Sequence, residues 1–154
     1  RAGFAAVTSP GRCEVVHRDP TVILDAAHNP HGAKALAQTL KSEFNFDEIV
    51  AVVGVFGDKD ALGILQELGP IVDHVIVTQS SSSRAMSSSD LEKLATSVFG
   101  NDRVFEVKDL HTALDRAVGD ATRPLSEDTV GIIVTGSVVT VGEARTYLRK
   151  KFAK

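Results

Sequence analysis

Cysteine is nearly absent from this chain of 154 residues, in which Cys13 is the single one. One cysteine cannot form an intrachain disulfide, and no cysteine and histidine residues cluster at metal-ligand spacing. Neither a disulfide-stabilised scaffold nor a zinc site is therefore expected. Because Cys13 falls in a predicted strand, we interpret it as a small core residue rather than a catalytic thiol.

Long hydrophobic runs are also missing. No apolar stretch approaches the roughly 18 residues that a membrane-spanning helix needs, and no charged-then-apolar leader opens the chain. These absences predict a cytoplasmic protein with no membrane partner. The chain begins at Arg1 rather than at methionine, which a fragment or an excised domain would explain.

A strong excess of one charge is the third absence. The formal net charge is −3, from 17 basic and 20 acidic residues, and the one basic block is Arg149-Lys150-Lys151. No nucleic-acid partner is therefore expected. Hydrophobic residues make up 43% and charged residues 24% of the chain, which is typical of one folded domain of this length.

Strands and helices alternate along the sequence. The predicted strands are 12–17, 21–26, 48–55, 73–78, 103–107 and 130–135, and the predicted helices are 31–44, 60–69, 88–99, 110–121 and 138–151. Valine-rich segments such as 49–53 show no period-two alternation, which indicates strands covered by helices on both faces. The pattern predicts an α/β fold with a Rossmann-like, doubly wound, mostly parallel six-stranded sheet.

The first strand is the exception to the parallel pattern. Arg18-Asp19-Pro20 is turn chemistry, so the strands on either side of it should form an antiparallel hairpin. That pairing would bring Arg12 towards the carboxyl end of the second strand, near Asp25. Two polar segments interrupt the later rhythm: 79–89, with seven serines, predicts a mobile loop with a helix N-cap within 87–89, and 123–128 predicts a polar connection.

Polar residues crowd the point where the apolar strand 22–24 ends. Asp25, His28, Asn29 and His31 come before or at the start of an amphipathic helix. Strand ends of an open α/β sheet present ligand-binding groups, and the N–H groups of a helix start favour anions. Each residue also has a purely structural explanation: Asp25 can bind backbone N–H groups, Asn29 can shape the turn, and His28 can be satisfied by local backbone. His31 is left unassigned.

Four segments together carry a family resemblance. The chain resembles the carboxy-terminal domain of folylpolyglutamate synthase and dihydrofolate synthase, relatives of the Mur ligases, through Pro10-Gly11-Arg12-x-Glu14, Leu24-Asp25-Ala26-Ala27-His28-Asn29-Pro30-His31-Gly32, Gly54-Val55-Phe56-Gly57-Asp58-Lys59-Asp60 and Thr135-Gly136-Ser137-Val138-Val139-Thr140-Val141-Gly142-Glu143-Ala144-Arg145. The resemblance implies an ATP-dependent ligase in which ATP phosphorylates a folate carboxylate and the amine of L-glutamate displaces phosphate. It also implies an amino-terminal ATPase domain, absent here, with the phosphate loop, the Mg²⁺ ligands and most of the folate site. Residues 1–11 would then be the interdomain linker and 12–154 the glutamate ligase domain, inactive alone.

The same resemblance assigns roles to individual residues. It implies ATP contacts for Arg12 and Asp25, a catalytic and glutamate-orienting role for His28, and a glutamate carboxylate contact for Ser137. A purely structural explanation of Gly136-Ser137, as a turn glycine followed by a helix cap, fits the sequence equally well. Weaker candidates for the site are Lys59, Arg84 and Asn29; no metal ligands are assigned on this chain.

Several common nucleotide-binding and catalytic motifs are missing from the sequence. The sequence contains no Gly-x-x-x-x-Gly-Lys-Ser/Thr, Gly-x-Gly-x-x-Gly or Gly-x-Ser-x-Gly, and no clustered carboxylates for Mg²⁺, so it can supply only part of a phosphoryl-transfer site. A Mur ligase acting on a peptidoglycan precursor is one alternative, although Gln79-Ser80-Ser81-Ser82 stands where those enzymes carry Asp-Asn-Pro-Arg. A non-catalytic nucleotide-binding or protein-interaction domain is the other.

Overall fold

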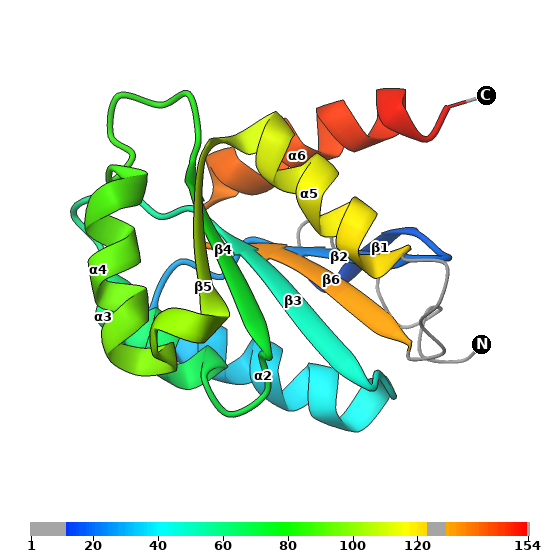
Figure 1. Cartoon of the computed structure of the whole chain (residues 1–154), viewed down its shortest axis with the longest axis horizontal. Helices are drawn as coiled ribbons and strands as arrows, with labels where there is room; N and C mark the ends of the chain where they lie inside the picture. The colour runs from blue at the N-terminus through cyan, green and yellow to red at the C-terminus, as the bar shows by residue number, and fades with distance from the viewer. Residues whose placement is uncertain (1–11, 123–128, 154) are drawn as a thin grey trace.

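The computed structural model describes residues 12–122 and 129–153. They form one sheet with helices on both faces (Figure 1). The predicted linker 1–11 and the predicted polar connection 123–128 lie outside the described residues.

The elements follow the predicted alternation. The strands are β1 (Glu14–His17), β2 (Thr21–Asp25), β3 (Glu48–Val53), β4 (His74–Gln79), β5 (Val104–Asp109) and β6 (Val130–Thr135). The helices are α2 (Pro30–Glu43), α3 (Ala61–Leu68), α4 (Ser88–Phe99), α5 (Leu110–Ala121) and α6 (Val138–Lys151), with a short 3₁₀ helix at Asn101–Arg103. Their order in the sheet is β1-β2-β6-β3-β4-β5. The pair β1–β2 is antiparallel and the other pairs are parallel, so the predicted α/β sheet is confirmed.

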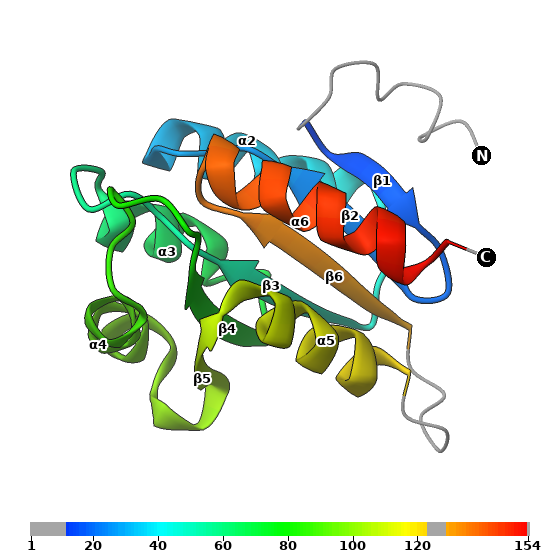
Figure 2. The ribbon, with the colours of Figure 1, turned by 90° about the horizontal axis from the view of Figure 1, so that it is seen from above.

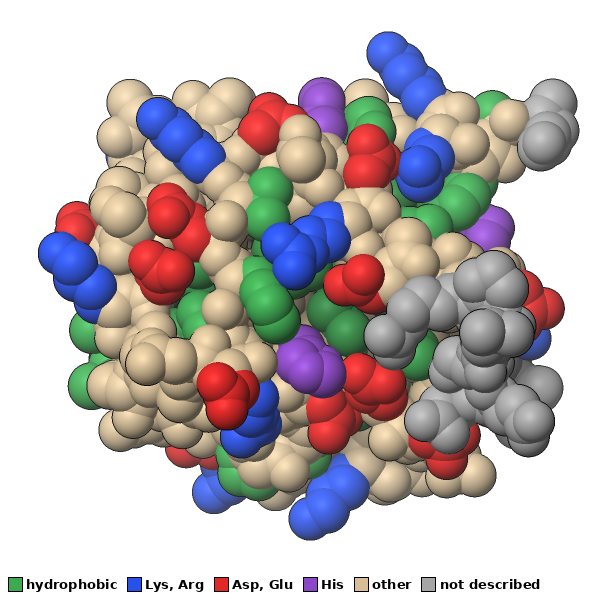
Figure 3. Space-filling view, in the orientation of Figure 1, with side chains coloured by type: hydrophobic (Ala, Val, Ile, Leu, Met, Phe, Trp, Pro, Cys, Tyr) green, Lys and Arg blue, Asp and Glu red, His purple; other side chains and the backbone are tan. Residues whose placement is uncertain are grey.

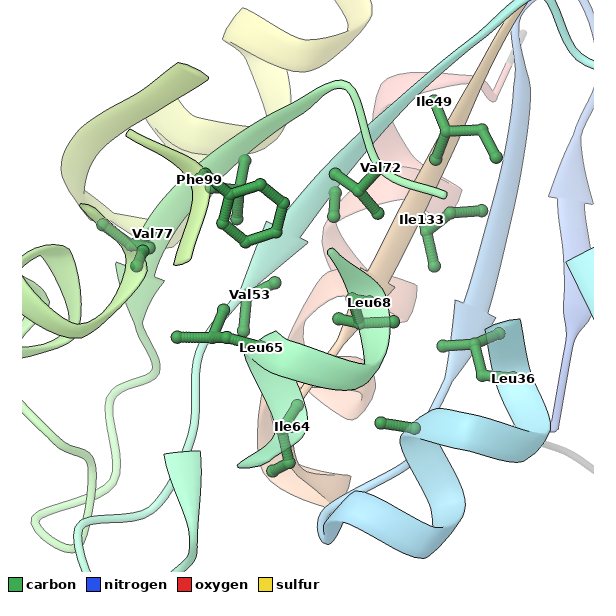
Figure 4. Close-up of a cluster of buried hydrophobic side chains, with 14 of the residues drawn as sticks. Leu36, Ile49, Val53, Ile64, Leu65, Leu68, Val72, Val77, Phe99 and Ile133 are labelled. Atoms are coloured by element: carbon green, nitrogen blue, oxygen red, sulfur yellow. The ribbon is translucent and has the colours of Figure 1, made fainter. Parts of the chain in front are cut away.

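Two hydrophobic cores fill the space between the sheet and the helices. Ala51 and Val53 of β3 pack with α2, α3 and α4 on one face, whereas Val50 and Val52 pack with α5 and α6 on the other. Figure 4 shows the first core, with Leu65 and Leu68 of α3 directed at the strand residues. Burial on both faces explains why the sequence of β3 is apolar without alternation.

The helices that follow the neighbouring strands β2 and β6 pack on opposite faces of the sheet. Helix α2 follows β2 onto the first core, and α6 follows β6 onto the second. Figure 2, seen from above, shows α6 lying over β2 with β1 beside it. Such a switch point opens a crevice outside the carboxyl ends of the strands, where α/β proteins bind ligands.

The local predictions at Cys13 and in the serine-rich loop had different outcomes. Cys13 is buried, as expected of a core residue, but the prediction that it lies within a strand is wrong: β1 begins at Glu14, and Cys13 has a left-handed φ of 46°. A strand residue needs an extended backbone. Cys13 instead has a left-handed backbone, and its N–H donates a hydrogen bond to the Asp25 carboxylate. In the serine-rich loop, Ser87 caps α4 by accepting from the Asp90 N–H at 3.1 Å, which confirms the predicted N-cap.

Candidate functional site

The five parallel strands end along one edge of the sheet, and hydrogen bonds join three of the loops that follow them. The Gly136 N–H donates to the Ala27 carbonyl at 3.1 Å, which links the β6 loop to the β2 loop. The Gly54 N–H donates to the Thr135 carbonyl at 3.2 Å, and the Thr140 hydroxyl donates to the Gly54 carbonyl at 2.9 Å. The loops after β2, β6 and β3 therefore form one connected rim.

Gly136 is the tightest point of this rim. Its φ is +121°, and a Cβ atom built there would lie 2.2 Å from the Gly54 carbonyl oxygen. Only glycine fits both the backbone conformation and the close approach of the two loops. The β6–α6 turn thus depends on Gly136, which the sequence identified only as a turn glycine.

Asp25 lies at the end of β2 and holds the surrounding backbone. Its Oδ2 accepts from the Cys13 N–H at 2.9 Å, and its Oδ1 accepts from the Ala27 N–H at 2.9 Å. Arg12 is exposed and directly precedes Cys13. The hairpin therefore brings Arg12 to the carboxyl end of β2, as predicted, and Asp25 fills the structural role that the sequence left open.

The same arrangement makes Cys13 chemically quiet. Burial first, and then the neighbouring Asp25 carboxylate, raise the pKa of the Cys13 thiol to about 12. A thiol with so high a pKa stays protonated near neutral pH and is a poor nucleophile. This supports the interpretation of Cys13 as a packing residue.

His28 and Asn29 lie on the exposed turn between β2 and α2. The His28 Nδ1 is 3.1 Å from the Ala26 carbonyl, and because a carbonyl can only accept, Nδ1 must carry the proton in that contact. The Nε2 atom of a neutral His28 then keeps a lone pair. Asn29 caps α2 by accepting from the Gly32 N–H at 2.7 Å, so its predicted turn-shaping role is confirmed. His31 is exposed in the first turn of α2.

Ser137 caps helix α6. Its Oγ accepts from the Thr140 N–H at 3.0 Å and donates to the Thr140 hydroxyl at 2.9 Å. The residue is 1% exposed, so its capping role is realised and its hydroxyl is covered. Val138, the next residue, is 65% exposed and marks the rim surface beside it.

Lys59 and Arg84 belong to a second group, over the β3–β4 part of the edge. The Arg84 guanidinium lies 3.4 Å from an Asp58 oxygen and 4.3 Å from the centre of the Phe56 ring. The backbone carbonyl of Arg84 accepts from the Gly57 N–H at 2.9 Å. Lys59, in the loop after β3, is half-buried. These contacts connect the serine-rich loop to the β3 loop, and β6 separates both from β2 in the strand order.

A cleft of about 1000 Å³ between α5 and α6 reaches the same edge, and sequence reasoning missed it. It is lined by residues from three distant segments, including Ser81, Lys108, His111, Glu143, Tyr147 and Lys150. The His111 and Tyr147 rings stack with centres 4.1 Å apart, and the Asp115 carboxylate, which accepts from the Tyr147 hydroxyl at 2.7 Å, raises the pKa of that phenol. No local motif announces such a cleft, because its walls meet only in the folded chain.

Two further properties concern the described residues as a whole. Within 12–122 and 129–153, no group of three or more His, Cys, Asp or Glu side chains is placed to hold a metal ion. In those same ranges no helix is long and apolar enough to cross a bilayer. On the face shown in Figure 3, acidic and basic side chains are interspersed.

Comparison with known proteins agrees with the family resemblance. A family model described as "Mur ligase, glutamate ligase domain" matches residues 11–138. The dihydrofolate synthase/folylpolyglutamate synthase of Mycobacterium tuberculosis is 49% identical over 154 residues, which cover 95% of this chain and 32% of that protein. The protein of the same name from Escherichia coli is 36% identical over 142 residues, covering 92% of this chain and 31% of the relative.

Solved structures give the same result. A crystal structure of Mycobacterium tuberculosis folylpolyglutamate synthase complexed with ADP and AMPPCP superposes with a TM-score of 0.84 at 49% identity, covering 99% of this chain and 34% of that one. A folylpolyglutamate synthase from Thermotoga maritima superposes with a TM-score of 0.78 at 31% identity, covering 100% of this chain and 34% of that one. The chain spans about a third of the length of the curated relatives it matches.

Proposed function

Since this chain belongs to the Mur ligase family as a glutamate ligase domain, we propose that it is the carboxy-terminal domain of an ATP-dependent enzyme that joins L-glutamate to a folate. The proposal is carried by the placement of Arg12, Asp25, His28 and Ser137 along one edge of the sheet. The relatives named above are folate ligases, which favours a folate over a peptidoglycan precursor as the acceptor.

The nucleotide end of the site is formed by Arg12 and Asp25. Arg12 is exposed beside the end of β2, and its guanidinium can donate forked hydrogen bonds to phosphate oxygens. Each Asp25 oxygen already accepts one backbone N–H, and Oδ2 also accepts from the Cys13 thiol, so one of the carboxylate's about four acceptor positions is left. Asp25 can therefore hold the hairpin under Arg12 and still accept from a ribose hydroxyl.

The amino-acid end is formed by His28 and the start of α6. With Nδ1 held by the Ala26 carbonyl, the Nε2 atom of His28 is the one that orients the glutamate amine or takes its proton. Ser137 is covered, so its contribution is made through the helix terminus that it caps. The first N–H groups of α6 and their dipole suit a glutamate carboxylate.

The reaction needs two charged reactants held in line. ATP phosphorylates the folate carboxylate, and the glutamate amine displaces phosphate from the acyl phosphate. Positioning and electrostatics do most of this work. The domain would close on an amino-terminal ATPase domain by a hinge at residues 1–11, with Lys59 and Arg84 near the phosphates or the neighbouring domain. Mg²⁺ ligands are expected on that other domain, and no step proposed here passes through a metal on this chain.

A chimaera tests the proposal. The matching third of the Mycobacterium tuberculosis enzyme is replaced by this chain, and ADP formation is measured with and without folate and glutamate. We expect turnover that requires both substrates, and no turnover by the 154-residue chain alone. An inactive chimaera beside an active parent enzyme, or ligation by this chain alone, would contradict the proposal.

Two histidines of the same turn provide a matched pair of variants. His28→Ala should lower kcat about 100-fold, because general acid–base groups commonly contribute ~10²–10⁴-fold. His31→Ala removes a ring that is also exposed and should leave kcat within about twofold. Equal effects of the two substitutions would remove His28 from the site.

A further inference from the structure

β1 lies at the edge of the sheet and leads directly from Arg12. In the sheet order its neighbour is β2. The left-handed Cys13, with φ of 46°, stands between Arg12 and the first residue of β1. The direction in which Arg12 leaves the sheet is therefore set by whatever fixes Cys13 and Glu14.

One anchor comes from β2 and the other from α6. On the β2 side, the Cys13 N–H donates to Asp25 at 2.9 Å, and Glu14 is in register with Leu24. On the α6 side, the Arg145 Nη2 and Nε lie 2.7 and 3.2 Å from the Glu14 Oε1. Leu24 belongs to the core under α5 and α6, and the side chain of Glu14 projects to the same face.

The Glu14–Arg145 ion pair fixes the relative position of β1 and α6. The two side chains are 23% and 21% exposed, so the pair is partly desolvated. Arg145 donates through two nitrogens of a rigid planar group, which fixes angle as well as distance. Ion pairs of exposed and flexible side chains hold position far less well.

The pair connects the two ends of the proposed site. Arg145 lies two turns along α6 from Ser137, and β1 lies beside α6 (Figure 2). The helix start faces the glutamate end, while β1 carries the nucleotide end. We propose that Glu14 and Arg145 are positioning residues, which hold Arg12 at a fixed place relative to the α6 N-terminus so that ATP and glutamate are aligned. This inference rests on the proposed function.

The other end of β1 supplies a control contact. There the His17 ring stacks on Phe152 with centres 3.5 Å apart, so β1 is attached to the end of α6 as well. Phe152→Leu weakens the attachment between the same two elements, away from the carboxyl edge. If the ion pair only stabilised the fold, breaking either contact would have the same kind of effect.

The experiment compares Glu14→Gln, Arg145→Lys and Phe152→Leu in the chimaera described above. Glu14→Gln keeps the shape of the side chain and removes its charge, and Arg145→Lys keeps the charge and removes the two-nitrogen geometry. Both should raise the KM for ATP about 10-fold with kcat within about threefold of the unsubstituted chimaera, since small misplacements of a positioning group can cost up to ~10²-fold. Phe152→Leu should lower the melting temperature and leave that KM within about twofold.

A double-mutant cycle completes the test. Because each single substitution already removes the fixed geometry of the pair, Glu14→Gln with Arg145→Lys should raise the KM for ATP no further than either alone. An unchanged KM in both single variants, with a loss of melting temperature like that of Phe152→Leu, would overturn the inference. If the unsubstituted chimaera has no activity, the proposed function fails, and ADP affinity measured by titration decides the inference: about 10-fold weaker binding in Glu14→Gln supports it, and equal binding refutes it.

Discussion

Replacing Gly136 by alanine should destabilise the protein severely, because the residue is confined in two independent ways. Its φ of +121° is one that L residues rarely adopt, which costs about 1–3 kcal/mol. The added Cβ would also lie 2.2 Å from the Gly54 carbonyl oxygen, a backbone atom that cannot rotate away, and overpacking costs a further ~1–3 kcal/mol. We expect a loss of about 2–6 kcal/mol, which corresponds to a melting temperature lower by roughly 4–24 °C for a chain of this size.

Gly142 offers the matched control on the same chain. It lies inside α6, and a Cβ atom there would meet nothing within 4 Å. Gly142→Ala should therefore stabilise the protein by about 0.5–1 kcal/mol, since glycine is a poor helix former. Urea unfolding monitored by circular dichroism gives the free energy of unfolding of both variants. A Gly136→Ala protein within about 1 kcal/mol of the unsubstituted protein, or a Gly142→Ala protein destabilised as strongly, would refute the reasoning.

Three further predictions use the same unfolding assay. Ser137→Ala removes the cap of α6 and should cost about 1–2 kcal/mol; an unchanged urea midpoint would show that the two bonds to Thr140 contribute nothing. The pKa of Cys13 is raised from 9.0 to about 12 by burial, so folding favours its protonated form; this stabilisation is complete below pH 9 and is lost as pH rises towards 12. Cys13→Ala should flatten that part of the pH profile, and an equal fall in both proteins would contradict it. Arg84→Ala removes a pair with Asp58 whose side chains are both 60% exposed and a contact with the Phe56 ring; each contributes at most ~1 kcal/mol at an exposed site, so a loss above ~2 kcal/mol would be unexpected.

The alternation of strands and helices along the chain could be predicted because each signal is local. Valine-rich strands, the turn residue Asn29, the cap at Ser137 and the turn before Thr21 are each encoded within a few residues of the structure they produce. The errors are also local. Cys13 reads as part of a strand because its composition suits one, and its left-handed backbone becomes visible only through the bond to Asp25.

The place of the candidate residues in the fold could be predicted, but the contacts that hold them could not. The hairpin register brings Arg12 to the end of β2, where Asp25 lies, and His28 follows three residues later in the chain. The contacts between Gly136 and Gly54, and between Glu14 and Arg145, join residues 82 and 131 positions apart. No periodicity relates such residues, so only the folded chain reveals that they touch.

The last strand to be synthesised is the one that completes the interior of the sheet. β6 fits between β2 and β3, so until residue 135 has left the ribosome those two strands present unpaired edges to their surroundings. Such edges invite association with other chains. Stable tertiary structure of this domain therefore has to wait until β6 has emerged, and a ribosome that stalls before β6 would release a chain prone to aggregate.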